Sequence, residues 1–398
     1  MTTFLSDKEL QARWERLQTK MSEIKADACI IVSNVNLYYL SGKIFTGYFY
    51  LPAEGEPVLF VRKPLGWNND NVVYIRKPED ISSWLQAKGI NAPKHILLEA
   101  DQLTYNDYVR LQAVFNPEKT SNATTLLRQI RSIKTDWEIS QFRISAKKHV
   151  EVYSRIKGCY SPGISDTEFQ AKIEYVMRSM GSIGFFRAFG SNMDIYMGSV
   201  LTGENAETPS PFDFALGGEG MDPSLPIGSN GTILKSGTSV MMDMAGNYTA
   251  YLTDMTRTFS IGKLPDIAYR AHQLSIDIQD AIAEKSKPGT SCAELYVLSL
   301  QMAENAGFSN YFMGTKQQAK FVGHGVGLEI NEPPVLTERS KELLAPGNVF
   351  ALEPKFVLPS IGAVGLENTF LVTDSGVEKL TLFEEQIIDL EENSPSDF

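Results

Sequence analysis

The sequence contains little cysteine and no long apolar run, and each absence excludes a class of protein. Its three cysteines, Cys29, Cys159 and Cys292, are an odd number without the spacing of a metal site, so a disulfide framework is not expected. No apolar run approaches the roughly 20 residues of a membrane helix, and the charged first residues lack the apolar core of a signal peptide. We therefore expect a protein of the reducing cytoplasm that does not cross a membrane.

An excess of basic residues is also absent. The chain has 37 lysine and arginine residues against 48 aspartate and glutamate residues, which gives a net charge of -11. This balance argues against a nucleic-acid-binding surface, because such a surface needs a basic patch. With 398 residues, of which 43% are hydrophobic, the chain can bury the cores of about two or three domains of roughly 150 residues each.

The first third of the sequence alternates between helical and strand-like patterns. Apolar residues recur at helical spacing from Leu10 to Ile24, behind the cap candidate Ser6. Strand-like apolar runs follow at 28–32, 58–61 and 95–98. This alternation predicts a small α/β domain over residues 1–132. A charged helical pattern begins near residue 133, and we assign residues 133–398 to a second domain.

The second domain contains an internal repeat. Residues 162–168 and 288–294 share the pattern Pro-Gly-x-Ser-x-x-Glu, which predicts a turn followed by a capping box. An amphipathic helical pattern follows each segment, and Gly181 and Gly307 stand at equivalent positions as C-terminal glycines. Each half of the domain is therefore expected to begin a helix in the same way.

Acidic residues repeat in the strands that follow these helices. Asp243 and Glu353 each come after a glycine at the same spacing, and Asp254 and Glu367 each begin an acid-x-Thr triplet. Two halves related by a pseudo-twofold axis would bring four carboxylates to one centre. Turns centred near Tyr248 and near residues 359–362 predict two hairpins, which place Asp243 opposite Asp254 and Glu353 opposite Glu367.

Four buried carboxylates need a compensating positive charge. Burying them is costly, and each raises the pKa of the others. Two divalent cations would balance the four charges, with His324 of the segment Phe-Val-Gly-His-Gly-Val-Gly as a fifth, neutral ligand. Taken singly, each acid also fits a structural ion pair and His324 a glycine turn, but the ordered set favours a metal site. Carboxylate and imidazole together suit Mn, Fe, Co or Zn better than Ca.

At this point the chain resembles the pita-bread metallohydrolases, a family that includes Xaa-Pro aminopeptidases, prolidases, methionine aminopeptidases and the metal-free creatinase. The segments that carry the resemblance are MMDMAG, TDMTRTF, GHGVGLEINEPP, ALEPKF and GLENTF. NVNLYYLSG and LRQIRSIKTDWEI resemble the creatinase-type N-terminal domain and its linker. The resemblance implies an α+β fold, in which a C-terminal pita-bread domain with an internal pseudo-twofold repeat follows a smaller α/β domain.

The resemblance also implies a role for each ligand. Asp243 would bind one metal, Asp254 and Glu367 would bridge two metals, and His324 and Glu353 would hold the second. Glu353 would also carry a proton to the leaving amine, after metal-activated water attacks a peptide carbonyl. The implied cofactors are two divalent ions, manganese first, with cobalt, zinc or iron as alternatives. The implied protein is a homodimer that acts on a small peptide, with one N-terminal domain closing the neighbour's cleft.

Two positions depart from the family pattern. Ile227 stands where the peptidases have a histidine in a Pro-His-Gly turn, and Asn331 replaces a second histidine before Glu-x-Pro. These histidines are thought to orient the substrate, and losing one such donor typically costs about 100- to 1000-fold in rate. Asn331 can still donate a hydrogen bond, whereas Ile227 cannot. Arg187 lies in an apolar run and is a candidate clamp for a substrate carboxylate, with a structural ion pair as the alternative.

Three functions therefore stay open at the level of sequence. The first is an Xaa-Pro aminopeptidase or dipeptidase. The second is another reaction at the same centre, such as hydrolysis of a small amide or a lyase reaction, which Ile227 and Asn331 favour. The third is a non-catalytic binding protein, which the retention of all five ligands disfavours.

Overall fold

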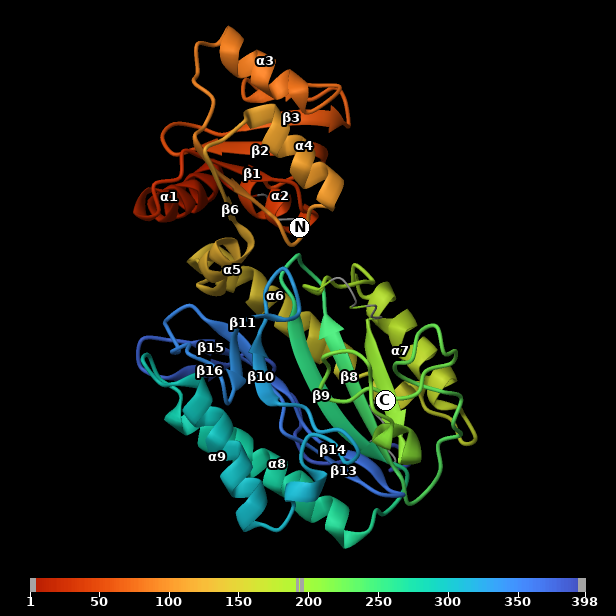
Figure 1. Cartoon of the computed structure of the whole chain (residues 1–398). Helices are drawn as coiled ribbons and strands as arrows, with labels where there is room; N and C mark the ends of the chain where they lie inside the picture. Colours follow the sequence, from red (N-terminus) through yellow and green to blue (C-terminus); the bar gives the residue numbers. More distant parts are fainter. Residues whose placement is uncertain (1–4, 191–192, 194–196, 393–398) are drawn as a thin grey trace. The chain divides into compact units, whose positions relative to one another are not determined.

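In the computed structural model, residues 5–190, 193 and 197–392 are described. The chain forms two compact units, Met1–Arg131 and Ser132–Phe398, which are coloured in sequence order in Figure 1. Within the described part of the chain, every helix is too short or too polar to cross a bilayer.

Unit 1 is built on a six-stranded sheet of order β4-β3-β2-β1-β5-β6. Its strands are β1 (Ala28–Ile31), β2 (Thr46–Pro52), β3 (Val58–Lys63), β4 (Val72–Tyr74), β5 (His95–Leu98) and β6 (Lys119–Asn122). Its helices are α1 (Asp7–Glu23), α2 (Asn34–Ser41), α3 (Glu79–Ala87), α4 (Tyr105–Phe115) and α5 (Thr124–Ser132). β1 pairs antiparallel with β2 and parallel with β5. The predicted strands at 28–32, 58–61 and 95–98 correspond to β1, β3 and β5, and Ser6 caps α1 as predicted.

Unit 2 contains two larger sheets and a small hairpin. The sheets have the orders β17-β9-β8-β7, β11-β10-β12-β15-β16 and β13-β14. The strands are β7 (Gly198–Thr202), β8 (Ser239–Gly246), β9 (Thr253–Ser260), β10 (Phe321–Gly325), β11 (Glu332–Thr337), β12 (Val349–Leu352), β13 (Lys355–Leu358), β14 (Gly362–Gly365), β15 (Asn368–Val372), β16 (Val377–Lys379) and β17 (Ile388–Asp389). The helices are α6 (Asp136–Tyr153), α7 (Asp166–Ser179), α8 (Asp266–Lys285) and α9 (Cys292–Asn305), with short 3-10 turns η1 (Ile156–Cys159), η2 (Gly203–Glu207) and η3 (Ser309–Tyr311).

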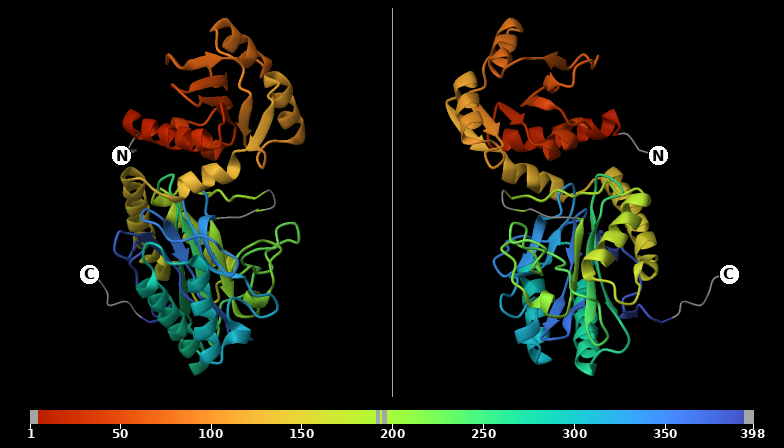
Figure 2. Two further views of the ribbon diagram at one scale, coloured as in Figure 1. Left: turned by 60° about the vertical axis from the view of Figure 1, so that its left-hand side comes forward. Right: turned by 90° about the vertical axis from the view of Figure 1, so that its right-hand side faces the viewer.

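Each half of unit 2 packs a pair of helices against its own strands. The core of the first half joins α6 and α7 to β7, β8 and β9, and that of the second joins α8 and α9 to β10, β12, β13 and β15. Figure 2 shows the two helix pairs on opposite outer sides of the strands. The strands of both halves therefore lie in the middle of the unit, where side chains from each half can meet.

The repeat predicted from sequence begins equivalent helices. Ser165 caps α7 by accepting a hydrogen bond from Glu168 N, and Ser291 caps α9 by accepting one from Glu294 N. The return bonds that would complete the two predicted capping boxes are not among the described hydrogen bonds. A complete capping box forms instead at Thr135, where α6 begins.

The two acid-bearing hairpins differ in how well their register was predicted. In the first, Asp243 pairs with Thr256 and Ala245 with Asp254, so the predicted direct opposition of Asp243 and Asp254 is wrong. The connection runs over residues 247–252, and its centre lies one residue later than the predicted turn. Because a shift of two pairing positions keeps side chains on the same face, both acids still point the same way.

The second hairpin follows the predicted register. Leu352 pairs with Asn368 on one side of the acids and Lys355 with Gly365 on the other. Glu353 therefore lies across from Glu367, as predicted.

Candidate metal centre

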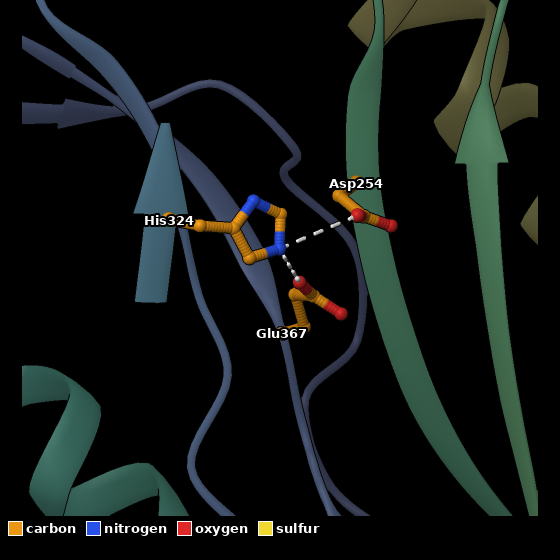
Figure 3. Close-up of side chains that lie close together, drawn as sticks. All are labelled: Asp254, His324 and Glu367. Carbon is orange, nitrogen blue, oxygen red and sulfur yellow. Dashed lines mark ion pairs between the residues drawn. The ribbon is translucent and has the colours of Figure 1, made fainter. Parts of the chain in front are cut away.

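The five predicted ligands come together in unit 2. Asp243 and Asp254 lie on β8 and β9, and His324 lies on β10. Along the chain, Glu353 lies between β12 and β13, and Glu367 lies between β14 and β15. Their donor atoms form two groups that share Glu367, and within each group the atoms lie within 4.8 Å of one another. We call Asp254, His324 and Glu367 the histidine group, which Figure 3 shows, and Asp243, Glu353 and Glu367 the lysine group.

The histidine group has the geometry of an open cation site. His324 Nε2 lies 3.2 Å from Glu353 Oε1, 3.9 Å from Asp254 Oδ2 and 4.0 Å from Glu367 Oε1. Glu367 Oε1 is buried and has no hydrogen-bond partner among the described residues. A buried oxygen without a partner is costly. Carboxylate and imidazole donors around a common point suit a divalent transition metal, so these residues fit such an ion.

The lysine group already contains a cation from the chain itself. Lys355 Nζ lies 2.8 Å from Asp243 Oδ2, 2.7 Å from Glu353 Oε2 and 3.2 Å from Glu367 Oε2. The lysine side chain is fully buried. Sequence reasoning missed this residue, although a lysine two positions after an acid in the apolar segment Ala-Leu-Glu-Pro-Lys-Phe-Val-Leu is the signal that could have found it.

The carboxylates titrate abnormally because they are buried close together. Burial, followed by the charges of Glu367 and Asp243, holds the pKa of Asp254 well above its usual range. Burial and the charge of Glu353 raise the pKa of Glu367 to about 8. Burial alone would raise the pKa of Glu353, but Lys355 and His324 outweigh it and lower that pKa to about 2. The protein atoms alone therefore leave the negative charge around Asp254 and Glu367 uncompensated.

The lysine and histidine side chains are affected in the opposite sense. Burial by itself would lower the pKa of Lys355, but Asp243, Glu353 and Glu367 together hold it well above the usual range. Burial would likewise lower the pKa of His324, but its contact with Glu353 raises it to about 9. Both side chains respond to the same surplus of carboxylates.

Hydrogen bonds across the two halves position the acids. Thr256 Oγ1 donates to Glu367 Oε2 at 2.7 Å. Thr369 Oγ1 accepts from Asp254 N at 2.8 Å and donates to Asp254 O at 2.9 Å. The buried Arg257 guanidinium donates to the backbone oxygens of Thr256 and Glu367, each at 2.8 Å. The threonine of each acid-x-Thr triplet thus holds the acid of the other half.

A cavity adjoins the centre, and all five predicted ligands line it. Other parts of its wall are apolar and include Phe186, Phe214, Ile227, Phe321 and Ile330. The cavity can therefore receive a small ligand that carries apolar groups next to the carboxylates.

Asn331 also lines this cavity, but its side chain holds a loop. Its Oδ1 accepts from Phe189 N at 2.7 Å, and its Nδ2 donates to Phe189 O at 2.8 Å. Arg187 is not among the residues that line the described cavity; its guanidinium lies 4.9 Å from the ring of Phe185. The predicted substrate contacts of Asn331 and Arg187 stay predictions.

Comparison with known proteins gives the family. Residues 140–374 match the model of metallopeptidase family M24, and residues 13–133 match that of the creatinase/prolidase N-terminal domain. The chain belongs to metallopeptidase family M24. As an M24 metallopeptidase it is a hydrolase that uses divalent metal ions, which confirms the predicted family and class of enzyme.

Individual relatives of this M24 metallopeptidase match along nearly the whole chain. The uncharacterised peptidase YqhT of Bacillus subtilis is 26% identical over 94% of this chain and 99% of its own length. An Xaa-Pro dipeptidase of Pyrococcus furiosus is 25% identical over 95% and 100%.

Solved structures confirm the predicted fold. The Xaa-Pro dipeptidase of Bacillus anthracis superposes with a TM-score of 0.78 at 22% identity, covering 96% of this chain and 99% of that one. The prolidase of Pyrococcus horikoshii OT3 gives a TM-score of 0.76 at 22% identity, covering 95% and 100%. The M24 metallopeptidase therefore has the α+β fold expected from its sequence, with a creatinase-type N-terminal domain before the catalytic domain.

Proposed function

We propose that the chain is a metal-dependent peptidase that cleaves at the Xaa-Pro bond of a small peptide. The observation that carries this proposal is the histidine group, in which a buried glutamate oxygen without a hydrogen-bond partner in the described part of the chain faces His324 beside an apolar cavity. The relatives named Xaa-Pro dipeptidase support the choice of substrate class.

In this proposal Asp254, His324, Glu353 and Glu367 hold the metal. A divalent cation at this position supplies Lewis-acid activation of water and of the scissile carbonyl. We propose Glu353 for the proton transfer, as the family resemblance implies; its Oε1 lies 3.2 Å from His324 Nε2 and its Oε2 lies 2.7 Å from Lys355 Nζ. That carboxylate accepts a proton as water attacks and passes it to the leaving amine.

The cavity wall supports a substrate with an apolar ring. Phe186, Phe214 and Phe321 contribute aromatic surface, and Ile227 replaces a polar donor with an aliphatic group. Apolar walls favour burial of a proline ring at roughly 25 cal/mol for each Å² removed from water. Asn331 keeps the segment around Phe189 in place and so shapes the same cavity.

Finer features of the enzyme are proposed with it. Manganese is the first metal to test, with cobalt, zinc and iron as alternatives, because all accept carboxylate and imidazole ligands. Residues 1–132 form the creatinase-like domain and residues 133–398 the catalytic domain of a cytoplasmic homodimer. The free thiols of Cys29, Cys159 and Cys292 support a reducing compartment.

A substrate panel at known metal content tests the proposal. Xaa-Pro dipeptides, longer Xaa-Pro peptides and small amides are assayed with protein loaded with Mn, Co, Zn or Fe, beside His324→Ala as the matched inactive control. The proposal expects Xaa-Pro cleavage that the control lacks. Turnover of a small amide without Xaa-Pro cleavage would replace the proposed substrate, and equal rates in the control would remove the metal from the mechanism.

A further inference from the structure

Glu353 and Glu367 each direct one carboxylate oxygen toward His324 and the other toward Lys355. Glu353 presents Oε1 to His324 at 3.2 Å and Oε2 to Lys355 at 2.7 Å. Glu367 presents Oε2 to Lys355 at 3.2 Å, and its Oε1 faces His324 without a hydrogen-bond partner among the described residues. On the lysine side both oxygens contact the ammonium, whereas on the histidine side Glu353 Oε1 contacts His324 and Glu367 Oε1 has no hydrogen-bond partner among the described residues.

Lys355 saturates the lysine group. An ammonium has three N–H donors and no acceptor, and three carboxylate oxygens lie within 3.2 Å of this one. Each donor therefore has its own acceptor, from Asp243, Glu353 and Glu367. The ammonium takes the position at which these three carboxylates would otherwise meet a metal ion.

A divalent ion and the ammonium cannot share that position. Transition metals bind carboxylate oxygens at about 2.0–2.2 Å, so an ion bound to the same oxygens would overlap Nζ. The lysine side chain is fully buried, and its neighbours Phe356 and Val357 are fully buried too. Strand pairing with Gly365 and a hydrogen bond from Met313 N to Lys355 O fix the backbone. Moving the charge aside would place it among apolar groups, which is costly.

We propose that the Lys355 ammonium stands in for one of two cations, so that this centre binds a single divalent ion, in the histidine group. This inference rests on the proposed metal binding by Asp254, His324, Glu353 and Glu367. One divalent ion and one ammonium together oppose the four carboxylates with three positive charges. The lysine group is then an internal ion cluster that keeps Asp243, Glu353 and Glu367 in place before any metal arrives.

Metal counting tests the inference on the full chain. Metal-free protein is titrated with Mn²⁺, and the bound metal is measured by calorimetry and elemental analysis. Wild type should saturate at about one ion per chain, Asp243→Asn should keep that ion, and His324→Ala should lose it. Lys355→Ala should open the lysine group and raise the count to about two. Lys134→Ala removes another buried lysine, which pairs with Glu332, and as the matched control should leave the count at about one.

Electron paramagnetic resonance of the Mn²⁺-loaded wild type gives a second readout that needs no variant. The inference expects the hyperfine pattern of an isolated ion, and a spin-coupled pair overturns it. Two ions bound to wild type, or none, overturn it as well. If Lys355→Ala does not fold, the metal count and the Mn²⁺ spectrum of wild type still decide between one bound ion and two.

The same samples separate this inference from the proposed function. Xaa-Pro cleavage by a two-ion wild type would sink the lysine assignment and leave the peptidase standing. A wild type that binds one ion but does not cleave Xaa-Pro peptides would support the lysine assignment and contradict the proposed peptidase.

Discussion

The histidine group and the lysine group lie side by side and share Glu367, yet they differ in how their negative charge is compensated. In the lysine group three carboxylates surround an ammonium that belongs to the chain. In the histidine group a buried oxygen of Glu367 faces an imidazole and has no partner among the described residues. The difference teaches that clustered acids alone do not define a metal site, because one lysine can convert such a cluster into an internal ion pair.

The largest expected effect comes from removing a ligand of the histidine group. His324→Ala should lose the metal and lower kcat/KM for an Xaa-Pro peptide by on the order of 100- to 1000-fold or more. Asp243→Asn, which touches the lysine group alone, should keep its metal. Peptide assays at measured metal content check the pair, and loss of metal from Asp243→Asn would erase the distinction between the groups.

The next effect concerns the stability that Lys355 provides. Removing one partner of a buried ion pair costs about 3–5 kcal/mol, so metal-free Lys355→Ala should unfold at clearly lower denaturant concentration than wild type. Lys134→Ala should be destabilised similarly, because Lys134 and Glu332 are both buried. Excess Mn²⁺ should restore Lys355→Ala more than Lys134→Ala, since only the former gains a new cation position. Equal restoration of the two variants would contradict the comparison.

Chelation of wild type should have an intermediate effect. An ion that binds the folded state alone adds about 2.7 kcal/mol at a hundredfold excess over its Kd. Metal removal should therefore lower the Tm while leaving a folded protein, because Lys355 still holds the lysine group together. Calorimetry before and after verified chelation measures the shift, and complete unfolding on chelation would show that the lysine group does not hold by itself.

A smaller effect is expected at Asn331, on the substrate side of the histidine group. Asn331→Ala removes both bonds to Phe189, at a cost of about 1–3 kcal/mol in loop stability. We expect KM for the peptide to rise by roughly tenfold, with a smaller change in kcat. Steady-state kinetics of wild type and variant test this. A fall in kcat alone would instead assign Asn331 to the chemical step, as the sequence first suggested.

The smallest effect is expected at His272 on α8, which belongs to neither the histidine group nor the lysine group. Burial lowers the pKa of His272 to about 4, while its unfolded value is about 6.5. The unfolded state therefore binds a proton that the folded state does not, so stability is full above pH 6.5 and is lost as the pH falls toward 4. His272→Gln keeps a donor for Glu385 O and should reduce the loss between pH 6.5 and 5.5 by about 1 kcal/mol. Denaturant unfolding at both pH values measures it, and an unchanged loss would refute the assignment.

Much of the centre was predictable because it is encoded by local patterns. The acid-x-Thr triplets and the glycine-flanked histidine are short motifs, and the strands that carry them place Asp254, His324 and Glu367 together. The register of β8 and β9 was missed by two positions, because a loop over 247–252 has no residue that marks its centre. An even shift did not move any acid to the other face.

Lys355 was not predicted for a different reason. Its role depends on its contacts with three acids. Asp243 and Glu367 are far from Lys355 in the sequence, and only Glu353 is close to it. In the sequence it is a single lysine in a buried strand, and only the fold shows which charges surround it. Asn331 is similar, because its bonds to Phe189 join segments far apart in the chain.

The crossed threonine bonds have a consequence for how the centre can be assembled. Thr256 of the first half holds Glu367 of the second, and Thr369 of the second holds the backbone of Asp254 in the first. Neither half carries a complete set of donors, although the second half holds Glu353 by its own His324 and Lys355. The two halves of unit 2 are thus obligate complements: a fragment of either one would carry its own acids but could not form the complete centre until its counterpart docked.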